Sequence, residues 1–289
     1  MNLPEIHFRH VFHRLTHMVN TAEYPKGEKW NMRETTVVRL NEDEIQLNDP
    51  ILLVGLPGVG HVGKLVVDHL VEKLEAEKVF EIYSPHFPPQ VMVNEDSTVK
   101  LVNNEIHIYS AGETDLVLLG GDHQSTTTDG HYELAGIYLK LAEELGVSKI
   151  YTLGGYPTGK LEHIDEVMGA ANDAELVEEL KEHGVTFKAS EPGGGIVGAS
   201  GLLLGLSKFT NMKAACLMGL TSGYLVDPKS AQSLLAILSK LINIEVDVAE
   251  LEERAKDMEK IVANLMEAKQ QQQGVLRDTA VEEDLRYIG

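Results

Sequence analysis

The sequence predicts an α/β fold with a mostly parallel sheet and helices on both of its faces. Short apolar runs alternate with helical patterns over about 200 residues, which is typical of strand–helix–strand units. Several of the apolar runs lack polar alternation, as expected for strands covered on both faces. Glycines follow many of these runs, where tight strand-to-helix turns need them. These observations favour one α/β domain over residues 32–245.

The expected strands are short and rich in apolar residues. They lie at Ile51–Gly55, Lys78–Tyr83, Val99–Asn103, Glu105–Tyr109, Leu116–Leu119, Lys149–Leu153 and Ala214–Met218. A further strand-like run spans Thr35–Leu40. Thr98–Leu101 and Ile106–Tyr109 flank the pair Asn103-Asn104, and asparagine tolerates positive φ. The pair therefore predicts a β-hairpin.

The expected helices carry start and stop signals. They lie at Val59–Leu74, Gly130–Leu145, Asp173–Glu182, Ile196–Leu206 and Pro228–Ile242. Gly146 and Gly184 follow two of them, where a C-terminal capping glycine belongs. Asp227-Pro228 fits an N-cap followed by the first helical position.

Composition and charge exclude several classes of protein. The 289 residues are 43% hydrophobic, which is enough for a sizeable core, and the net charge of −20 disfavours a general nucleic-acid binder. Apolar runs such as Ile51–Val54 are far shorter than the ~20 residues of a membrane span. Cys216 is the only cysteine, so disulfides within the chain are impossible and a thiolate zinc site is nearly so. The chain start lacks a secretory pattern. We expect a cytoplasmic protein with no membrane or nucleic-acid partner.

Residues 1–31 differ in character from the rest of the chain. His7, His10, His13 and His17 recur at helical spacing, so a metal site is conceivable. The alternatives are a flexible extension, which we favour, or translation that starts at Met32. We expect no metal.

The region 246–270 carries a heptad pattern. Its apolar seam, spaced 3, 4, 3, 4, 3, consists of Val248, Leu251, Ala255, Met258, Val262 and Leu265. Charged pairs such as Glu250 with Arg254 occupy the other faces. The helix either packs between protomers of an oligomer, which we favour slightly, or lies on its own domain. Residues 271–289 are expected to form a flexible acidic tail.

The loop from Gly55 to Lys64 is the strongest local signal. Gly58, Gly60 and Gly63 match the dinucleotide-binding spacing G-x-G-x-x-G, and Glu81 lies near where a ribose-binding acid belongs. The same loop matches most of a phosphate-binding G-x-x-x-x-G-K-[ST] motif. Leu65 replaces its magnesium-binding hydroxyl, which argues against hydrolysis of a nucleoside triphosphate. The other interpretation is that the glycines only shape a tight turn.

Other glycine pairs end further strands and bring polar residues to the same predicted sheet edge. Asp122, His123, Gln124 and Tyr156 are the candidates there, because ligands of open α/β sheets bind at the carboxyl edge. An Asp-His pair is suited to acid–base work, but the same residues also suit a polar loop that caps a helix. We expect no catalytic residues. Cys216 lies in an apolar strand and is expected to be a core residue.

Taken in order, four motifs resemble the archaeal branch of the proteasome assembly chaperone family. They are the Gly55–Lys64 loop, Gly120-Gly-Asp-His-Gln124, Leu153-Gly-Gly-Tyr156 and Met168-Gly-Ala-Ala-Asn-Asp173. The resemblance covers about residues 33–270. It implies a fold similar to purine nucleoside phosphorylase, a homo-oligomer, and no catalytic activity or cofactor.

The resemblance also implies a role for the C-terminus. Some members bind the α-ring of the proteasome core particle through tails that end in hydrophobic-Tyr-any. Here Leu285, Tyr287, Ile288 and Gly289 are the matching residues, and tyrosine stands one position further from the end. The resemblance therefore implies a non-catalytic, proteasome-binding assembly factor. The alternative is a nucleotide- or small-ligand-binding α/β enzyme that uses the loop 55–64.

Overall fold

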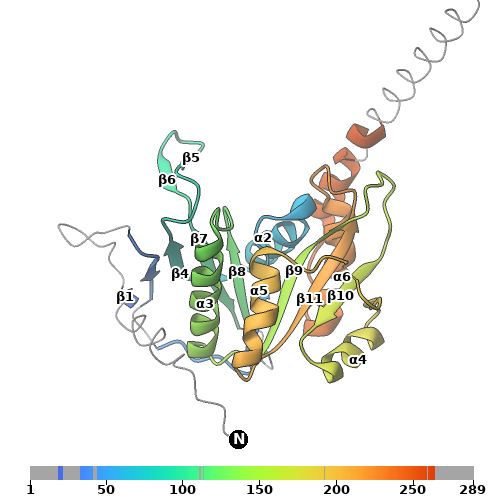
Figure 1. The fold of residues 1–289 in the computed structure, drawn as a ribbon. Helices are drawn as coiled ribbons and strands as arrows, with labels where there is room; N and C mark the ends of the chain where they lie inside the picture. The colour runs from blue at the N-terminus through green and yellow to red at the C-terminus, as the bar shows by residue number, and fades with distance from the viewer. Residues whose placement is uncertain are drawn as a thin grey trace, which may run out of the picture.

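The computed structural model describes residues 19–21, 33–41, 44–110, 112, 114–191, 193–258 and 260–263. Within these ranges a mixed nine-stranded sheet has the order β1-β2-β4-β7-β8-β3-β9-β11-β10 (Figure 1). Its strands are β1 (Val19–Thr21), β2 (Thr36–Arg39), β3 (Ile51–Val54), β4 (Glu77–Tyr83), β7 (Asn104–Tyr109), β8 (Leu116–Gly121), β9 (Lys149–Pro157), β10 (Val167–Ala171) and β11 (Lys213–Thr221). A separate pair consists of β5 (Val91–Val93) and β6 (Val99–Leu101).

The parallel part of the sheet is its centre. β8, β3, β9 and β11 run parallel, whereas β2, β4 and β7 join on one side and β10 on the other in antiparallel fashion. β1 pairs with β2 in parallel, so the extension predicted over residues 1–31 contains a strand that is joined to the sheet. His7, His10, His13 and His17 lie outside the described residues.

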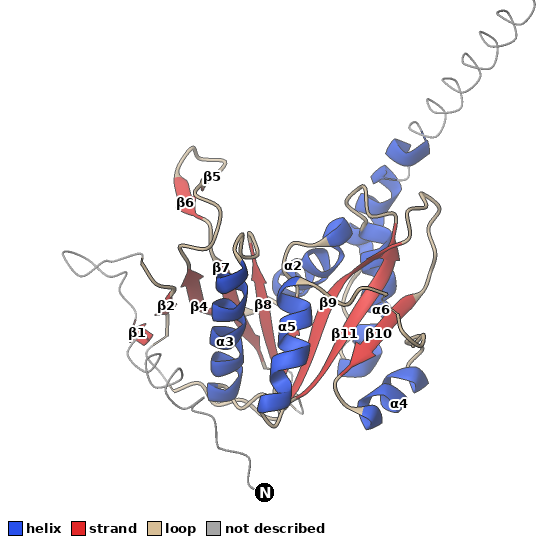
Figure 2. Cartoon of the chain, viewed as in Figure 1, coloured by secondary structure: helices blue, strands red, loops and turns tan. Residues whose placement is uncertain are grey.

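Helices cover both faces of the sheet (Figure 2). α3 (Thr128–Glu144) and α5 (Gly198–Leu206) pack on one face. The other face carries α2 (Val62–Lys73), α4 (Ala174–Glu182), α6 (Pro228–Ile242) and the beginning of a helix over 249–263. The predicted α/β fold with helices on both faces is confirmed.

The central strand β3 shows how the sequence builds the two cores. Leu52 and Val54 belong to the core under α3 and α5, whereas Ile51 and Leu53 belong to the core under α2 and α6. Successive side chains of a strand point to opposite faces, so an entirely apolar strand is required wherever both faces are covered. All four residues of β3 are buried, as the absence of polar alternation predicted.

The helix ends follow the expected caps. The Asp227 side chain accepts a hydrogen bond from the Ser230 N–H ahead of α6, and Asp173 does the same for Leu176 ahead of α4. Gly146 and Gly184 have φ of 77° and 91°, the left-handed values of C-terminal caps. None of the described helices is long and apolar enough to cross a membrane.

The predicted hairpin around Asn103-Asn104 is wrong. β6 pairs with β5, whereas β7 lies between β4 and β8 in the main sheet. Asn104 is buried within β7, and its side-chain amide is hydrogen-bonded to the Tyr138 hydroxyl at 2.6 Å. The asparagine pair is therefore not a turn, because its second residue is a sheet residue held by a side-chain contact.

Candidate functional site

The glycine-rich loop lies at the carboxyl edge of the central strands. It leaves β3 at Val54, forms a short 3-10 turn η2 (Val59–His61), and enters α2 at Val62. Gly60 and His61 have φ of 63° and 52°, so two successive residues adopt the left-handed conformation. Glycine takes this conformation without steric cost, which accounts for Gly60.

The other glycines bring α2 close to the sheet. A Cβ on Gly63 would lie 2.0 Å from the Leu153 carbonyl oxygen of β9, and one on Gly55 would lie 2.2 Å from the Gly63 carbonyl oxygen. Both neighbours are backbone atoms, so no side chain can move aside. Gly58 differs, because the atoms nearest to a Cβ at this position would be 3.9 Å away. Two of the four glycines therefore serve the packing of helix on sheet.

Neighbouring segments hold the loop in place. Gln124, which follows β8, donates from Nε2 to the Pro57 carbonyl oxygen at 2.7 Å and accepts from the Ala199 N–H of α5 at 3.0 Å. The Asp227 N–H donates to the Gly60 carbonyl oxygen at 2.9 Å. Gln124 thus bridges the glycine loop and the start of α5, a role that sequence analysis did not assign to it.

Lys64 is engaged by the protein itself. Its ammonium group pairs with Asp68 at 2.8 Å and donates to the Gly121 carbonyl oxygen at 3.1 Å. In a phosphate-binding loop this lysine would reach for phosphates. Here it connects α2 to the end of β8, which gives the lysine a structural role.

Glu81 does not lie where a ribose-binding acid would be needed. In a dinucleotide-binding fold the acid ends a strand close to the glycine loop. β4, however, is separated from β3 by β7 and β8. Glu81 is buried, pairs with Lys78 at 2.7 Å and accepts a hydrogen bond from the Tyr83 hydroxyl at 2.9 Å. The suggestion that Glu81 binds a ribose is therefore wrong.

Three of the remaining polar candidates, Asp122, His123 and Tyr156, each form an ion pair or hydrogen bond with a different residue. Asp122 pairs with Lys100 at 3.2 Å, whereas the His123 ring is hydrogen-bonded to the Gln90 side chain at 3.0 Å. Tyr156 donates to Glu191 at 3.0 Å. Cys216 is buried in β11, and burial raises the pKa of its thiol to about 11. Asp122 and His123 are thus not arranged as a hydrogen-bonded acid–base pair.

The first half of the heptad seam faces this chain's own domain. Leu251 and Ala255 are buried, and Leu251 belongs to the core beneath α2 and α6. Glu250 pairs with Lys73 of α2 at 2.9 Å, and the Asp247 carbonyl oxygen is hydrogen-bonded to the His69 ring at 2.7 Å. These two seam residues are therefore covered within one protomer, as the alternative interpretation of the helix expected.

The second half of the seam is more open. Met258 and Val262 are half-buried and line a groove of about 300 Å³ beside the loop that precedes α6. Leu265 and the tail residues Leu285, Tyr287, Ile288 and Gly289 lie outside the described residues. An intermolecular role for the seam and the docking of the tail both stay predictions.

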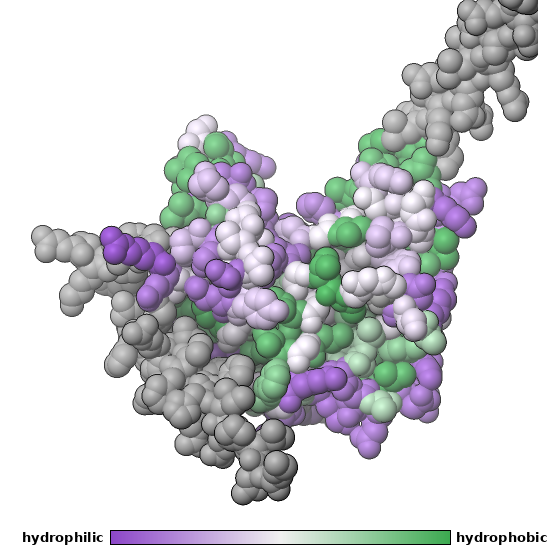
Figure 3. All heavy atoms as spheres, viewed as in Figure 1, coloured by the Kyte–Doolittle hydropathy of each residue, from purple (hydrophilic) through white to green (hydrophobic). Residues whose placement is uncertain are grey.

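The glycine loop lies on a concave face between two projections. Figure 3 shows this face hollowed between the β5–β6 hairpin and the outer turns of the helix over 249–263. The β5–β6 hairpin is not among the candidates named from the sequence, although the sequence carries a signal for it. Its signal was the apolar run Val91–Val93 followed by the polar cluster Asn94–Ser97, a strand and turn pattern.

Comparisons with known proteins identify the family to which this fold belongs. The model of the PAC2 family matches residues 52–266. An uncharacterized protein of Methanocaldococcus jannaschii is 39% identical over 254 residues, which cover 88% of this chain and 97% of that protein.

Solved structures with the same fold agree with this family match. The crystal structure of Pyrococcus furiosus PbaB, an archaeal proteasome activator, is 38% identical with a TM-score of 0.75, and the match covers 81% of this chain and 100% of PbaB. P. furiosus PbaA, an archaeal homologue of proteasome-assembly chaperone, is 22% identical with a TM-score of 0.66, and the match covers 89% of this chain and 100% of PbaA. The PbaA likeness shows the fold alone. The resemblance drawn from the sequence motifs is confirmed, and the chain belongs to the PAC2 family.

Proposed function

We propose that this protein is a non-catalytic, homo-oligomeric factor that binds the α-ring of the proteasome core particle through its C-terminal tail. The observation that carries the proposal is the likeness to the proteasome activator PbaB, at 38% identity over the whole of that chain. The internal contacts of the glycine loop support a non-catalytic role. Gly63 is packed on β9, Gln124 holds the Pro57 carbonyl group, and Lys64 is paired with Asp68.

The position of the last described helix supports a role for the tail. The helix over 249–263 is anchored at its start by Leu251 and the Glu250–Lys73 pair, and its outer turns extend beyond the strands in Figure 1. Residues 274–289 would span up to about 53 Å if fully extended. A tail that starts from this end of the domain has ample reach to pockets on a neighbouring ring.

The chemistry of the chain end suits a narrow pocket. Tyr287 and Ile288 supply an aromatic ring and an aliphatic side chain, and the terminal carboxylate can form charge-assisted hydrogen bonds with a lysine. Several weak tails on one oligomer would gain affinity from their effective concentration. The half-buried Met258 and Val262 remain candidates for contacts between protomers.

The test measures binding of the full chain to archaeal core particles and to isolated α-rings. Deletion of residues 287–289 should weaken binding by tenfold or more, a loss of at least about 1.4 kcal/mol. Tyr287→Ala should act in the same direction, whereas Arg286→Ala is the matched control and should retain most of the affinity. The unfolding temperature and the mass in solution should stay unchanged in all three variants.

Unaltered binding by the truncated chain would refute tail docking and would direct attention to the α/β domain. Peptide hydrolysis by the core particle, measured with and without the protein, separates activation of the mature particle from a role in assembly alone. Activation predicts faster hydrolysis with the full chain and no acceleration after deletion of residues 287–289.

A further inference from the structure

A small polar pocket lies between α2 and the strands β7 and β8. Its volume is about 240 Å³, and its lining comes from α2, β6, β7 and the end of β8. Ile106 belongs to the core under α3 and α5, so Glu105 and His107 on either side of it point toward α2. The Asn103 side chain lies with them, because its Nδ2 donates to the Glu105 carboxylate at 3.4 Å. Polar side chains at positions 103, 105 and 107 therefore line one side of the pocket.

Two buried atoms of this lining, Asn103 Oδ1 and His107 Nδ1, have no hydrogen-bond partner among the described residues. Asn103 is 3% exposed, and the side chain of His107 is 12% exposed. Because the Nδ2 end of the Asn103 amide is held by Glu105, the end without a partner is an acceptor. Roughly 90% or more of buried polar groups in native proteins are hydrogen-bonded, so the pocket lacks an occupant with donors.

His107 presents a second acceptor. Its Nε2 lies 3.7 Å from the Glu105 carboxylate, which favours the tautomer with the proton on Nε2. Burial lowers the pKa of the ring, so the imidazole is neutral at pH 7. The Nδ1 of this tautomer carries a lone pair and no proton. Both unpartnered atoms therefore need a donor.

The charged lining of the pocket favours a cationic occupant. Lys64 pairs with Asp68 at 2.8 Å, and Lys100 pairs with Asp122 at 3.2 Å, so both lysines of the lining are already neutralised within it. Carboxylates outnumber ammonium groups in the lining, which contains Asp68, Glu72, Glu105, Asp122, Lys64 and Lys100.

The other two carboxylates pair with lysines outside the lining. Glu72 lies 3.6 Å from Lys73. Glu105 lies 3.2 Å from Lys78, but the same ammonium group is closer to Glu81, at 2.7 Å. Glu105 therefore shares its lysine with a second carboxylate. Its own carboxylate stands between the two unpartnered acceptors along the chain, where an incoming cation would meet all three.

We propose that this pocket binds a small aliphatic amine, whose ammonium group is held by Asn103 Oδ1, His107 Nδ1 and the Glu105 carboxylate. A protonated primary amine carries three N–H donors, which matches these three acceptors. Val67 and Val71 of α2 also line the pocket and provide an apolar surface for a short alkyl chain. The volume lies below the roughly 300–1,000 Å³ of sites for drug-sized molecules, so the ligand is small.

A metal ion fits this pocket less well than an amine. The described part of the chain contains no group of three or more His, Cys, Asp or Glu residues placed to hold a metal ion. The unpartnered amide oxygen and imidazole nitrogen require hydrogen-bond donors, which an ammonium group supplies and a bare cation does not.

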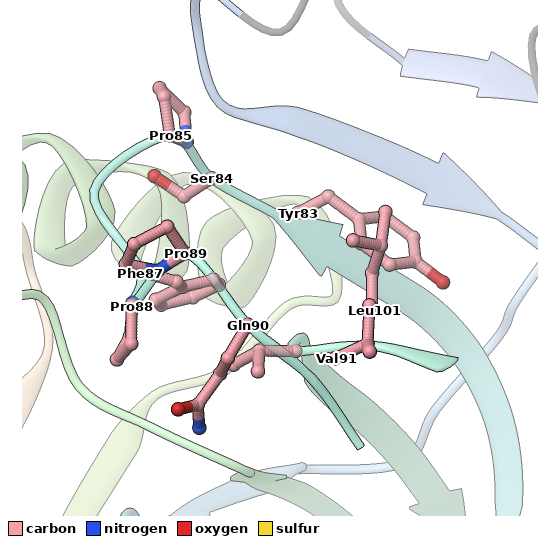
Figure 4. A pocket seen from close by; sticks show the side chains of 10 residues that line it. Tyr83, Ser84, Pro85, Phe87, Pro88, Pro89, Gln90, Val91 and Leu101 are labelled. Atoms are coloured by element: carbon pink, nitrogen blue, oxygen red, sulfur yellow. The ribbon is translucent and has the colours of Figure 1, made fainter. Parts of the chain in front are cut away.

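A larger hollow in the structure gives no comparable indication of a ligand. It has a volume of about 480 Å³ and lies at the base of the β5–β6 hairpin. Figure 4 shows Phe87 and the proline run on one side of this hollow, and Tyr83 and Leu101 on the other. None of the described residues that line it carries a charge, so its chemistry does not define a ligand.

The first test titrates n-butylamine into the full chain by calorimetry and measures the unfolding temperature at the same concentrations. Tetramethylammonium is the matched control ligand, because it carries the same charge without any N–H donor, and potassium chloride controls for ionic strength. Butylamine should bind saturably and raise the unfolding temperature. Absence of binding, or an equal effect of tetramethylammonium or potassium, would overturn the proposal.

The second test removes the acceptors. Asn103→Leu and His107→Phe should each weaken butylamine binding by about tenfold or more, because a hydrogen bond to a charged group is lost. Without amine, Asn103→Leu should keep or raise the unfolding temperature, since it removes a buried acceptor that has no partner. His183→Phe is the control: this exposed histidine ends α4, which packs on the edge strand β10. It should bind butylamine as the wild type does.

A measurement on the unaltered chain does not depend on the folding of any variant. The ¹⁵N resonance of His107 Nδ1 should shift on saturation with butylamine and stay in place with tetramethylammonium. Saturable binding without this shift, or unchanged affinity in both pocket variants, would contradict the assigned site. Amine binding and α-ring binding involve different residues, so either proposal can fail while the other holds.

Discussion

At the scale of single residues, the glycine loop illustrates how one motif fits two functions. The spacing of Gly58, Gly60 and Gly63 is the same whether the loop receives phosphates or packs a helix on a sheet. The atoms around each glycine distinguish the two roles. Gly63 faces the backbone of β9, whereas a Cβ on Gly58 would have no neighbour closer than 3.9 Å.

Gly63→Ala should therefore destabilise the protein by about 4 kcal/mol or more, because a methyl group would overlap the Leu153 carbonyl oxygen. Gly58→Ala is the control within the same motif, and its stability should stay within about 0.5 kcal/mol of the wild type. Urea unfolding followed by circular dichroism measures both. Equal losses in the two variants would contradict the packing role assigned to Gly63.

The motif residues could be identified from the sequence, but their surroundings could not. Nothing in the order of residues shows that Gln124 reaches both Pro57 and Ala199, because the three are joined only by the tertiary fold. Glu81 was misassigned for the same reason: its distance along the chain from Gly63 fits a ribose-binding acid, yet two strands lie between β4 and β3.

At the scale of elements, the helix over 249–263 is the clearest case of an ambiguous pattern. A heptad seam has the same spacing whether the helix packs on its own domain or on another protomer. The structure shows that Leu251 enters the chain's own core, while Met258 and Val262 line an open groove. One helix thus combines an anchored start with a less covered end.

The anchored start should respond to acid. Hydrogen bonds from Lys73 and Arg254 lower the pKa of Glu250 below its ordinary value. Since the folded pKa lies below that of the unfolded chain, the contribution of Glu250 to stability is present above the unfolded pKa and is lost as the pH falls through the folded one. Lys73→Met should raise the Glu250 pKa, as measured by NMR titration of its carboxyl carbon.

Lys260→Met is the control for this titration, because Lys260 pairs with Asp257 at 2.8 Å rather than with Glu250. It should leave the Glu250 pKa unchanged. If Lys73→Met also leaves it unchanged, the Lys73–Glu250 pair does not persist in solution. The helix is then anchored by the buried Leu251 and Ala255 and by the hydrogen bond between His69 and the Asp247 carbonyl oxygen.

The strands were predicted where apolar side chains dominate, as in Ile51–Val54 and Leu116–Leu119. β10 was missed because its sequence, Val167-Met-Gly-Ala-Ala171, contains small residues with weak strand preference. The pairing of β5 with β6 was missed because Asn103-Asn104 offered a competing turn. Strand partners are set by packing, which a local pattern does not contain.

At the scale of the whole molecule, the family relationship and the loop geometry together predict that nucleotides do not stabilise the folded protein. A ligand at 100 times its dissociation constant would stabilise the folded protein by about 2.7 kcal/mol. For a domain of this size that corresponds to a rise of roughly 5–10 °C in unfolding temperature. We expect no such rise with saturating NAD, or with saturating ATP and magnesium.

Lys64→Met should give the same flat result in this assay, because Lys64 is engaged by Asp68 and the Gly121 carbonyl group. A clear shift in the wild type that disappears in Lys64→Met would show that the loop binds nucleotide. The alternative of a ligand-binding enzyme would then replace the non-catalytic proposal.

The strand order has a consequence for biosynthesis. β3 is synthesised early, yet its two neighbours in the sheet are β8 and β9. Leu52 therefore cannot pair with Val117 and Ile150 until these later strands have been synthesised. A nascent chain that has left the ribosome only as far as β7 carries an apolar central strand with neither partner available. Pairing between strands that are far apart in the sequence slows folding, and apolar surface that is prone to aggregation stays exposed until the strands pair. This strand order therefore gives the protein a folding route that leaves apolar segments unprotected until most of the chain has emerged.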